Sequence, residues 1–200
     1  HYGRLKRLAD NSPIIDYNQS PAPTPTPLKK DYFFDGTAGI YQTFNADNTA
    51  NTVWIFPTMR RGGRMVYGFD VSTPSSPTLK WRKGCTDPSM SDTASCSTGM
   101  TQMGQSWSIP AVATIKGFTN GGGAEAGKDV PLVIMGGGYD TCEDTDSSTS
   151  TCSSPKGNRV FVLNADTGAV IAATAVAKIS RNKWSIACAR LSSSDTLRGG

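Results

Sequence analysis

The sequence has little charge, a single histidine and no long hydrophobic run, and each shortage excludes a class of protein. Charged residues make up 18% of the chain, against about 25% in an average globular domain. The 20 basic and 16 acidic residues leave a net charge of +4, and the densest basic runs are pairs such as Lys29-Lys30. Dispersed charge of this size excludes a nucleic-acid-binding stripe. No stretch approaches the roughly 18 apolar residues of a membrane-spanning helix.

The shortage of histidine excludes the common nucleophilic enzymes. His1 stands at the first position, so neither a serine nor a cysteine nucleophile has a suitable base. Residues 122–128 match the spacing of a phosphate-binding loop, but Asp129 stands where the Mg²⁺-binding Ser or Thr is required. We therefore expect a flexible loop there, no bound cofactor and no enzyme activity in this chain.

The cysteines form two local pairs. Each pair encloses a polar segment, and the spacing within a pair is wider than the two to four residues typical of zinc ligands. We predict two disulfide-closed surface loops, Cys85–Cys96 and Cys142–Cys152, with free buried thiols as the alternative. Disulfides indicate an exported protein in an oxidising compartment. Cys188 is left over.

One acidic stretch is a weak candidate for a metal site. It contains the four carboxylates Asp140, Glu143, Asp144 and Asp146, and carboxylate oxygens are the ligands that Ca²⁺ prefers. The residue order of an EF-hand is absent, however, and no glycine supplies its mid-loop turn. The pattern therefore favours a solvated acidic loop.

The chain divides into a short N-terminal part and one longer domain. Residues 1–30 contain a brief amphipathic stretch and then a Pro/Thr-rich run at 21–27, which predicts an extended linker. We expect ordered structure from Asp31, so that residues 31–200 form the domain.

The domain contains a repeating pattern of short strands. Apolar residues 53–56 lead through a glycine turn into an alternating strand at 64–71, and residues 132–135 and 158–165 repeat this order. The tripeptide Trp-Ser-Ile recurs at 107–109 and 184–186. Repeated units of four short strands are typical of a β-propeller, whose blades must stack to bury a core.

This pattern predicts an all-β fold: a partial β-propeller of about two blades and the start of a third, preceded by the Pro/Thr-rich linker. The glycines at 136–138 are expected at a strand end where two backbones approach closely. Trp81, Trp107 and Trp184 are expected at strand positions, packing between blades rather than stacking on a ligand.

Five segments follow one another in a distinctive order. They are Tyr32-Phe33-Phe34-Asp35-Gly36-Thr37, the glycine turn and strand from Arg60 to Ser72, Gly104-Gln105-Ser106-Trp107-Ser108-Ile109-Pro110, Val133 to Asp140, and Gly157-Asn158-Arg159-Val160-Phe161-Val162-Leu163. Together they resemble the C-terminal β-propeller domain of the PilC/PilY class of type IV pilus biogenesis factors and tip adhesins. The resemblance covers about residues 31–186.

The resemblance implies a piece of a large non-enzymatic protein of the bacterial surface, pilus tip or outer membrane. Such a protein supports pilus extension against retraction and attaches the cell to surfaces, with minor pilins or the pilus tip as partners and a host-surface receptor as a further contact. The family's calcium site follows the third opening strand, but residues 187–200 contain a single Asp. The chain is atypical after 186, which indicates a truncated or frameshifted gene or a piece that ends early, so calcium is expected only in a full-length protein.

Two alternatives remain open at this point. A fragment of a quinoprotein dehydrogenase propeller would share the strand pattern, although no cofactor-stacking tryptophan with neighbouring metal ligands is evident. A purely structural propeller that scaffolds an outer-membrane assembly would differ by leaving the number of pili unchanged on deletion.

Overall fold

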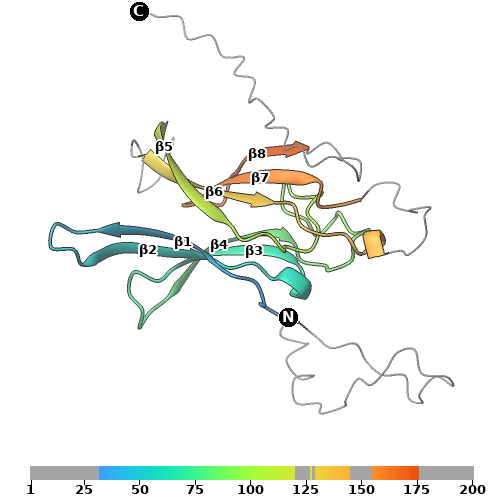
Figure 1. Cartoon of the computed structure of the whole chain (residues 1–200), viewed down its shortest axis with the longest axis horizontal. Helices are drawn as coiled ribbons and strands as arrows, with labels where there is room; N and C mark the ends of the chain where they lie inside the picture. The colour runs from blue at the N-terminus through green and yellow to red at the C-terminus, as the bar shows by residue number, and fades with distance from the viewer. Residues whose placement is uncertain (1–31, 120–126, 128, 145–154, 176–200) are drawn as a thin grey trace, which may run out of the picture.

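The fold is all-β and consists of two four-stranded antiparallel sheets, each built from strands consecutive in the sequence (Figure 1). The computed structural model describes residues 32–119, 127, 129–144 and 155–175. The predictions for the linker, Asp146, Cys152, Trp184 and Cys188 lie outside these residues. The first sheet contains β1 (Gly39–Phe44), β2 (Ala50–Phe56), β3 (Arg64–Asp70) and β4 (Thr78–Cys85). The second contains β5 (Ala111–Thr119), β6 (Asp129–Gly136), β7 (Arg159–Asn164) and β8 (Val170–Ala175).

The two sheets are repeats of one unit. In each, the third strand ends on a residue whose side chain caps the following turn. Asp70 ends β3 and accepts a hydrogen bond from the Ser72 backbone N–H at 2.9 Å. Asn164 ends β7 and accepts from the backbone N–H groups of Asp166 and Thr167 at 2.8 and 3.0 Å. The predicted repeat is therefore confirmed, and the two sheets correspond to two blades of a partial β-propeller.

The hydrophobic core lies between the sheets. Since side chains alternate between the two faces of a strand, Trp54 and Phe56 of β2 both point toward the second sheet and are 7% and 0% exposed. The second sheet contributes Val133 and Met135 from β6 and Phe161 from β7, among others. A four-stranded sheet cannot bury both of its own faces, so the pair of sheets is the smallest unit with a core.

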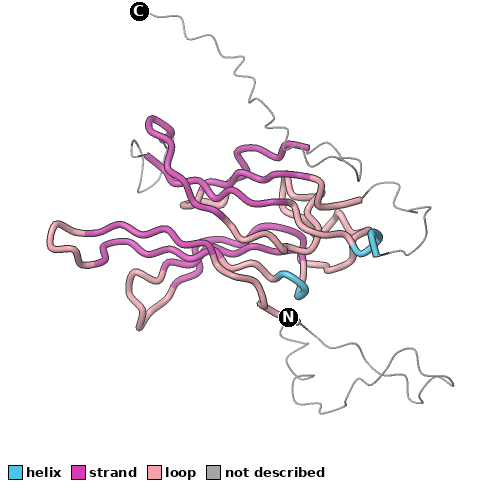
Figure 2. The backbone as a smooth tube through the Cα atoms, in the orientation of Figure 1, coloured by secondary structure: helices cyan, strands magenta, loops and turns pink. Residues whose placement is uncertain are grey.

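The segment between β4 and β5 has no regular strand (Figure 2), yet it is fastened to both sheets. Met100 and Met103 are completely buried in the core. The completely buried Ser106 accepts hydrogen bonds through Oγ from the backbone N–H groups of Met59 and Arg60 at 3.0 and 3.2 Å. Gln105 pairs with Tyr139 beyond the end of β6. The segment therefore not only links the two sheets along the chain but also forms hydrogen bonds with residues next to each of them.

The glycines after β6 allow this pairing. Gly138 has a φ of 98°, and a Cβ built there would lie 1.9 Å from the Gln105 carbonyl oxygen. Gly157, at φ 84°, approaches the Gly138 carbonyl in the same way, at 2.2 Å. Only glycine combines a positive φ with so close an approach of two backbones. The prediction that backbone meets backbone at this strand end is confirmed.

Candidate partner-binding surface

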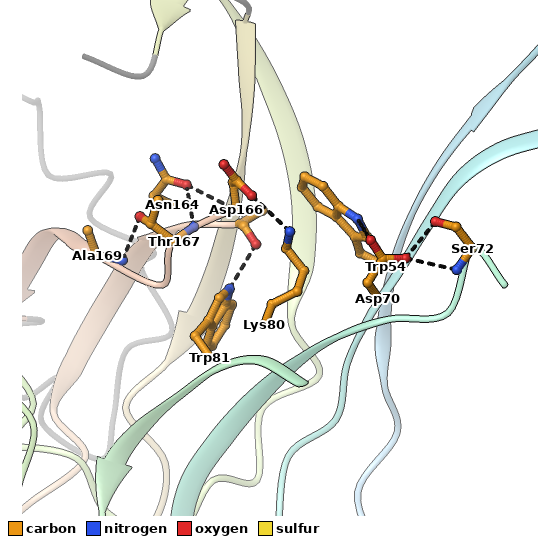
Figure 3. A network of polar contacts seen from close by, with 10 residues as sticks. Trp54, Asp70, Ser72, Lys80, Trp81, Asn164, Asp166, Thr167 and Ala169 are labelled. Atoms are coloured by element: carbon orange, nitrogen blue, oxygen red, sulfur yellow. Dashed lines mark hydrogen bonds and ion pairs between the residues drawn. The ribbon is translucent and has the colours of Figure 1, made fainter. Parts of the chain in front are cut away.

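A polar network crosses the seam between the sheets (Figure 3). Lys80 Nζ of β4 lies 2.8 Å from Asp166 Oδ1 in the β7–β8 turn, and the two side chains are only 15% and 19% exposed. The same ammonium lies 3.9 Å from the ring centroid of Trp54. Because water is mostly excluded here, this ion pair and cation–π contact are stronger than on an open surface. They fix the position of one blade on the other.

Asp70 anchors the other side of the Trp54 indole. Its carboxylate accepts from Trp54 Nε1 at 3.2 Å and from Ser72 Oγ at 2.6 Å, in addition to the Ser72 backbone. Burial by itself raises the pKa of Asp70, but the hydrogen bonds from Ser72 and Trp54 and the charge of Lys80 outweigh it, so the pKa lies below its ordinary value. The carboxylate is therefore the favoured form in the folded protein.

This network predicts a pH-dependent contribution to stability. Asp70→Asn should lower the free energy of unfolding by about 1 kcal/mol near neutral pH, because hydrogen bonds to a charged acceptor weaken. As the pH falls below about 3.9, the unfolded chain takes up this proton first, and the contribution is lost as the pH passes through the folded-state pKa. Urea unfolding of both proteins between pH 7 and pH 2 measures this difference. A difference that stays constant down to pH 2 would contradict the assignment.

A depression lies beside this network. It is lined by Tyr41, Thr52, Trp54, Asp129, Val130, Pro131 and Asp166, and has a volume of about 340 Å³ including space open to solvent. Thr52 contributes an aliphatic hydroxyl to the lining, Asp129 and Asp166 contribute carboxylates, and the ammonium of Lys80 pairs with Asp166.

A second feature is a partly exposed group of arginines and aromatic rings, which we call the aromatic–arginine surface: Tyr32, Arg60, Arg61, Trp107 and Tyr139, of which Arg61 and Trp107 are exposed and the others half-buried. The Arg60 guanidinium lies 4.3 Å from the Trp107 ring centroid, and that of Arg61 lies 4.0 Å from the Tyr32 ring centroid. Asp35 accepts a hydrogen bond from Arg61 Nε at 2.7 Å, while Tyr139 meets Trp107 edge to face. The two arginines are therefore held in place by contacts on the protein itself.

The backbone beneath this surface is constrained. Arg60 begins the 3₁₀ turn η2 (Arg60–Gly62) and has a φ of 52°, a left-handed conformation that is rare for residues other than glycine. The hydrogen bonds from the Met59 and Arg60 backbone N–H groups to Ser106 Oγ hold it there. Strained backbone of this kind is concentrated at functional sites, which makes Arg60 a residue of interest.

The expectation for Trp107 is wrong in its details. Trp107 precedes β5 rather than lying in a strand, and it is 40% exposed. Its Nε1 donates to Gln105 Oε1 at 3.1 Å. The ring does contact a residue from each half, Arg60 and Tyr139, but at the surface. Trp81, by contrast, is 6% exposed and packs between the sheets as predicted.

In the part of the acidic loop that the structure describes, Asp140 binds the protein backbone. Asp140 is 5% exposed and accepts hydrogen bonds from the backbone N–H groups of Cys142 and Lys156 at 3.0 and 2.8 Å. Glu143 is exposed and follows in the 3₁₀ turn η3 (Thr141–Asp144). Among the described residues, no group of three or more His, Cys, Asp or Glu side chains is arranged to hold a metal ion.

The Cys85–Cys96 disulfide is present and closes a loop at the end of β4. Cys142 is also disulfide-bonded, and its predicted partner Cys152 lies outside the described residues. The loop between Cys85 and Cys96 covers Arg64, whose guanidinium donates to the backbone carbonyls of Ser89 and Asp92. Sequence reasoning did not single out Arg64 as a buried group.

Removal of this disulfide should destabilise the protein measurably. For the Cys85→Ser/Cys96→Ser double variant we expect the free energy of unfolding to fall by about 2–3 kcal/mol, since the cross-link restricts the unfolded chain. Thermal or urea unfolding under non-reducing conditions gives the value. Wild-type protein measured under the same non-reducing conditions is the reference, and an unchanged free energy of unfolding in the double variant would contradict the prediction.

Comparison with solved structures gives a likeness of fold. No family model matches the chain, and no curated protein matches it. The crystal structure of the Pseudomonas aeruginosa PilY1 C-terminal domain is similar over 74% of this chain, with 18% sequence identity and a TM-score of 0.42. The chain spans 23% of the length of that protein chain. In the described residues, no helix has the length and hydrophobicity to cross a membrane. The fold assignment rests on the strand order and register of the chain itself.

Proposed function

We propose that this chain is part of an exported, non-enzymatic surface protein that acts in type IV pilus biogenesis and attachment through protein–protein contacts. The observation that carries the proposal is the series of five family-like segments, of which the two that contain a third strand fall on equivalent positions of the two sheets. The segment ending at Ser72 includes β3, and the segment from Gly157 to Leu163 forms most of β7. The disulfides support passage through an oxidising compartment.

The proposed partners are minor pilins or other components of the pilus tip, with a host-surface receptor as a second contact. The aromatic–arginine surface is the part of the molecule best suited to such a contact. Tryptophan, tyrosine and arginine are enriched among the residues that dominate binding energy, and here Trp107 is 40% exposed with Arg60 already positioned on it. A surface whose side chains are held in place before binding loses less conformational entropy on association.

The test is deletion of the gene that encodes the complete protein, with surface pili counted in normal and retraction-deficient cells. We expect pili to be lost in the normal background and to return when retraction is disabled. Complementation with Arg60→Ala/Trp107→Ala should fail to restore pili, whereas Lys116→Ala, on the exposed strand β5, should restore them. Unchanged pili and twitching in the deletion strain would overturn the proposal, and dye reduction with an alcohol or sugar substrate would then be assayed.

A further inference from the structure

The aromatic–arginine surface lies at one end of the two sheets, not on the face of a sheet. Arg60 follows the end of β2, Trp107 precedes the start of β5, and Tyr139 follows the end of β6. The contacts of Trp107 with Arg60 and Tyr139 bring these ends together, and Figure 2 shows the 3₁₀ turns η2 and η3, in cyan, at this end. Since the two sheets pack through their faces, the stacking of blades does not use this end.

The Arg60 guanidinium is held by an aromatic ring rather than by an oxygen acceptor. It lies over the Trp107 ring, 4.3 Å from the ring centroid. In the part of the chain that the structure describes, the Arg60 side chain has no hydrogen bond or ion pair. Arg61 differs, because its Nε donates to Asp35 Oδ2 at 2.7 Å. The N–H donors of Arg60 are therefore available to a ligand, at a position that the contact with Trp107 fixes.

The repeated unit does not require this arginine. The turn η2 joins β2 to β3, and η3 lies between β6 and β7, the equivalent strands of the second sheet. The turn η3 contains the acidic residues Glu143 and Asp144 and no basic residue. A side chain that the packing of every blade requires should recur in both turns, whereas Arg60 occurs only in the first. Arg60 thus combines a strained φ of 52° with a side chain that the repeat does not require, which is the pattern expected of a binding residue.

A carboxylate is the ligand that fits this position best. Its two oxygens match the planar fork of a guanidinium and accept two parallel hydrogen bonds from it. Trp107, which is 40% exposed, offers a surface beside the arginine on which an apolar side chain can pack. A nucleic acid fits less well, because its phosphates are bound by stripes of basic residues, and Arg61, the second arginine here, is already paired with Asp35. The combination favours an acidic residue flanked by an apolar one, in a polypeptide.

We propose that the aromatic–arginine surface binds an acidic segment of a partner protein. In the complex, an Asp or Glu carboxylate accepts hydrogen bonds from Arg60, and a neighbouring apolar side chain packs on Trp107. The inference rests on the proposed function, because it specifies what the partner presents to the surface assigned there. Since the attracting charges are only partly buried, the affinity should fall as the ionic strength rises.

The test is a titration of the 200-residue chain with two short peptides, followed by NMR through the indole N–H signal of Trp107. The peptide Gly-Glu-Phe-Glu-Gly, with both ends blocked, carries the carboxylates, and Gly-Gln-Phe-Gln-Gly is its uncharged match. We expect the acidic peptide to shift the Trp107 signal and to bind at least about tenfold more tightly than the amide peptide, because hydrogen bonds to a charged acceptor are stronger. The Trp107→Phe variant identifies the signal by removing it.

Three variants separate a specific carboxylate contact from general attraction to a basic protein. Arg60→Gln should weaken binding of the acidic peptide at least about tenfold, because it removes the charged donors. Arg60→Lys keeps the charge but lacks the planar fork, and should weaken binding nearly as much. Arg82→Gln removes the same charge from an exposed arginine of β4 and should bind as wild type. Circular dichroism confirms that each variant is folded.

Three results would overturn the proposal: equal binding of the two peptides, wild-type binding by Arg60→Gln protein, or no shift of the Trp107 signal at about 10 mM peptide. Tighter binding of a short single-stranded oligonucleotide at the same signal would also do so, because it points to a phosphate ligand. The peptide titration uses purified protein and needs no pili, so the two proposals can fail separately. Unchanged pili in the deletion strain with intact peptide binding would refute the proposed function, whereas lost pili without peptide binding would refute this inference alone.

Discussion

Trp81→Ala is expected to lower the free energy of unfolding by about 3–5 kcal/mol, the range typical of removing a large buried aromatic ring. Trp81 stacks on Phe56 with ring centroids 5.6 Å apart and covers Gly168, whose Cβ would lie 2.6 Å from the indole. Its Nε1 donates to the Ala165 carbonyl at 2.9 Å. The ring therefore carries apolar and polar contacts across the seam at once.

Trp81→Phe separates these two contributions. It keeps an aromatic ring in the core and removes the hydrogen bond to the second sheet, so we expect a loss of about 1–2 kcal/mol from the unpaired Ala165 carbonyl and the smaller ring. Urea unfolding followed by far-UV circular dichroism measures both variants. A loss below about 1 kcal/mol for Trp81→Ala would show that the two sheets do not depend on this residue.

Arg64→Met should lower the free energy of unfolding by about 3 kcal/mol, because it removes charge-assisted hydrogen bonds from a buried guanidinium to three backbone carbonyls. Arg64 is completely buried. Its Nε donates to the Met103 carbonyl at 2.8 Å, and Nη1 donates to the carbonyls of Ser89 and Asp92. Burial lowers the pKa of the guanidinium, while the nearby carboxylate of Asp92 opposes the shift.

Arg64→Lys is the matched variant, since it keeps the charge but cannot reach three carbonyls from one planar group. We expect it to be intermediate between wild type and Arg64→Met. Because Arg64 and the disulfide hold the same loop, the losses from Arg64→Met and Cys85→Ser/Cys96→Ser should be less than additive when combined. Full additivity in urea unfolding would contradict a shared role in fixing that loop.

The repeat unit could be predicted from the sequence because its signals are local. Alternation along 64–71, the apolar run at 53–56 and the glycines at 136–138 each depend on neighbouring residues, and β3, β2 and the end of β6 lie where these signals place them. The glycines are especially informative, because the close approach of two backbone segments at Gly138 excludes any side chain.

The contacts that join the sheets could not be predicted in the same way. Arg64 stands in an alternating strand and reads as a surface charge, but its partners are carbonyls 25 to 39 residues away. From the sequence, Ser106 is indistinguishable from the other polar residues of its loop. Its burial depends on hydrogen bonds from the start of η2, more than 40 residues earlier. Trp107 is predicted to pack between blades because it lies in a strand-like pattern next to small residues, whereas its exposure follows from its position just before β5.

The separation in sequence between the partners at the seam has a consequence for the order of folding. Within each sheet, neighbouring strands are consecutive, so each pairing closes a short loop and loses little chain entropy. The bonds across the seam close much longer loops, 84 residues for Trp81 with Ala165 and 86 for Lys80 with Asp166. Contacts of high sequence separation form slowly, and we expect docking of the two preformed sheets to be the last and slowest step. Until then Trp54, Phe56 and Trp81 face water, and an early Cys85–Cys96 bond shortens the connection that must bring them together.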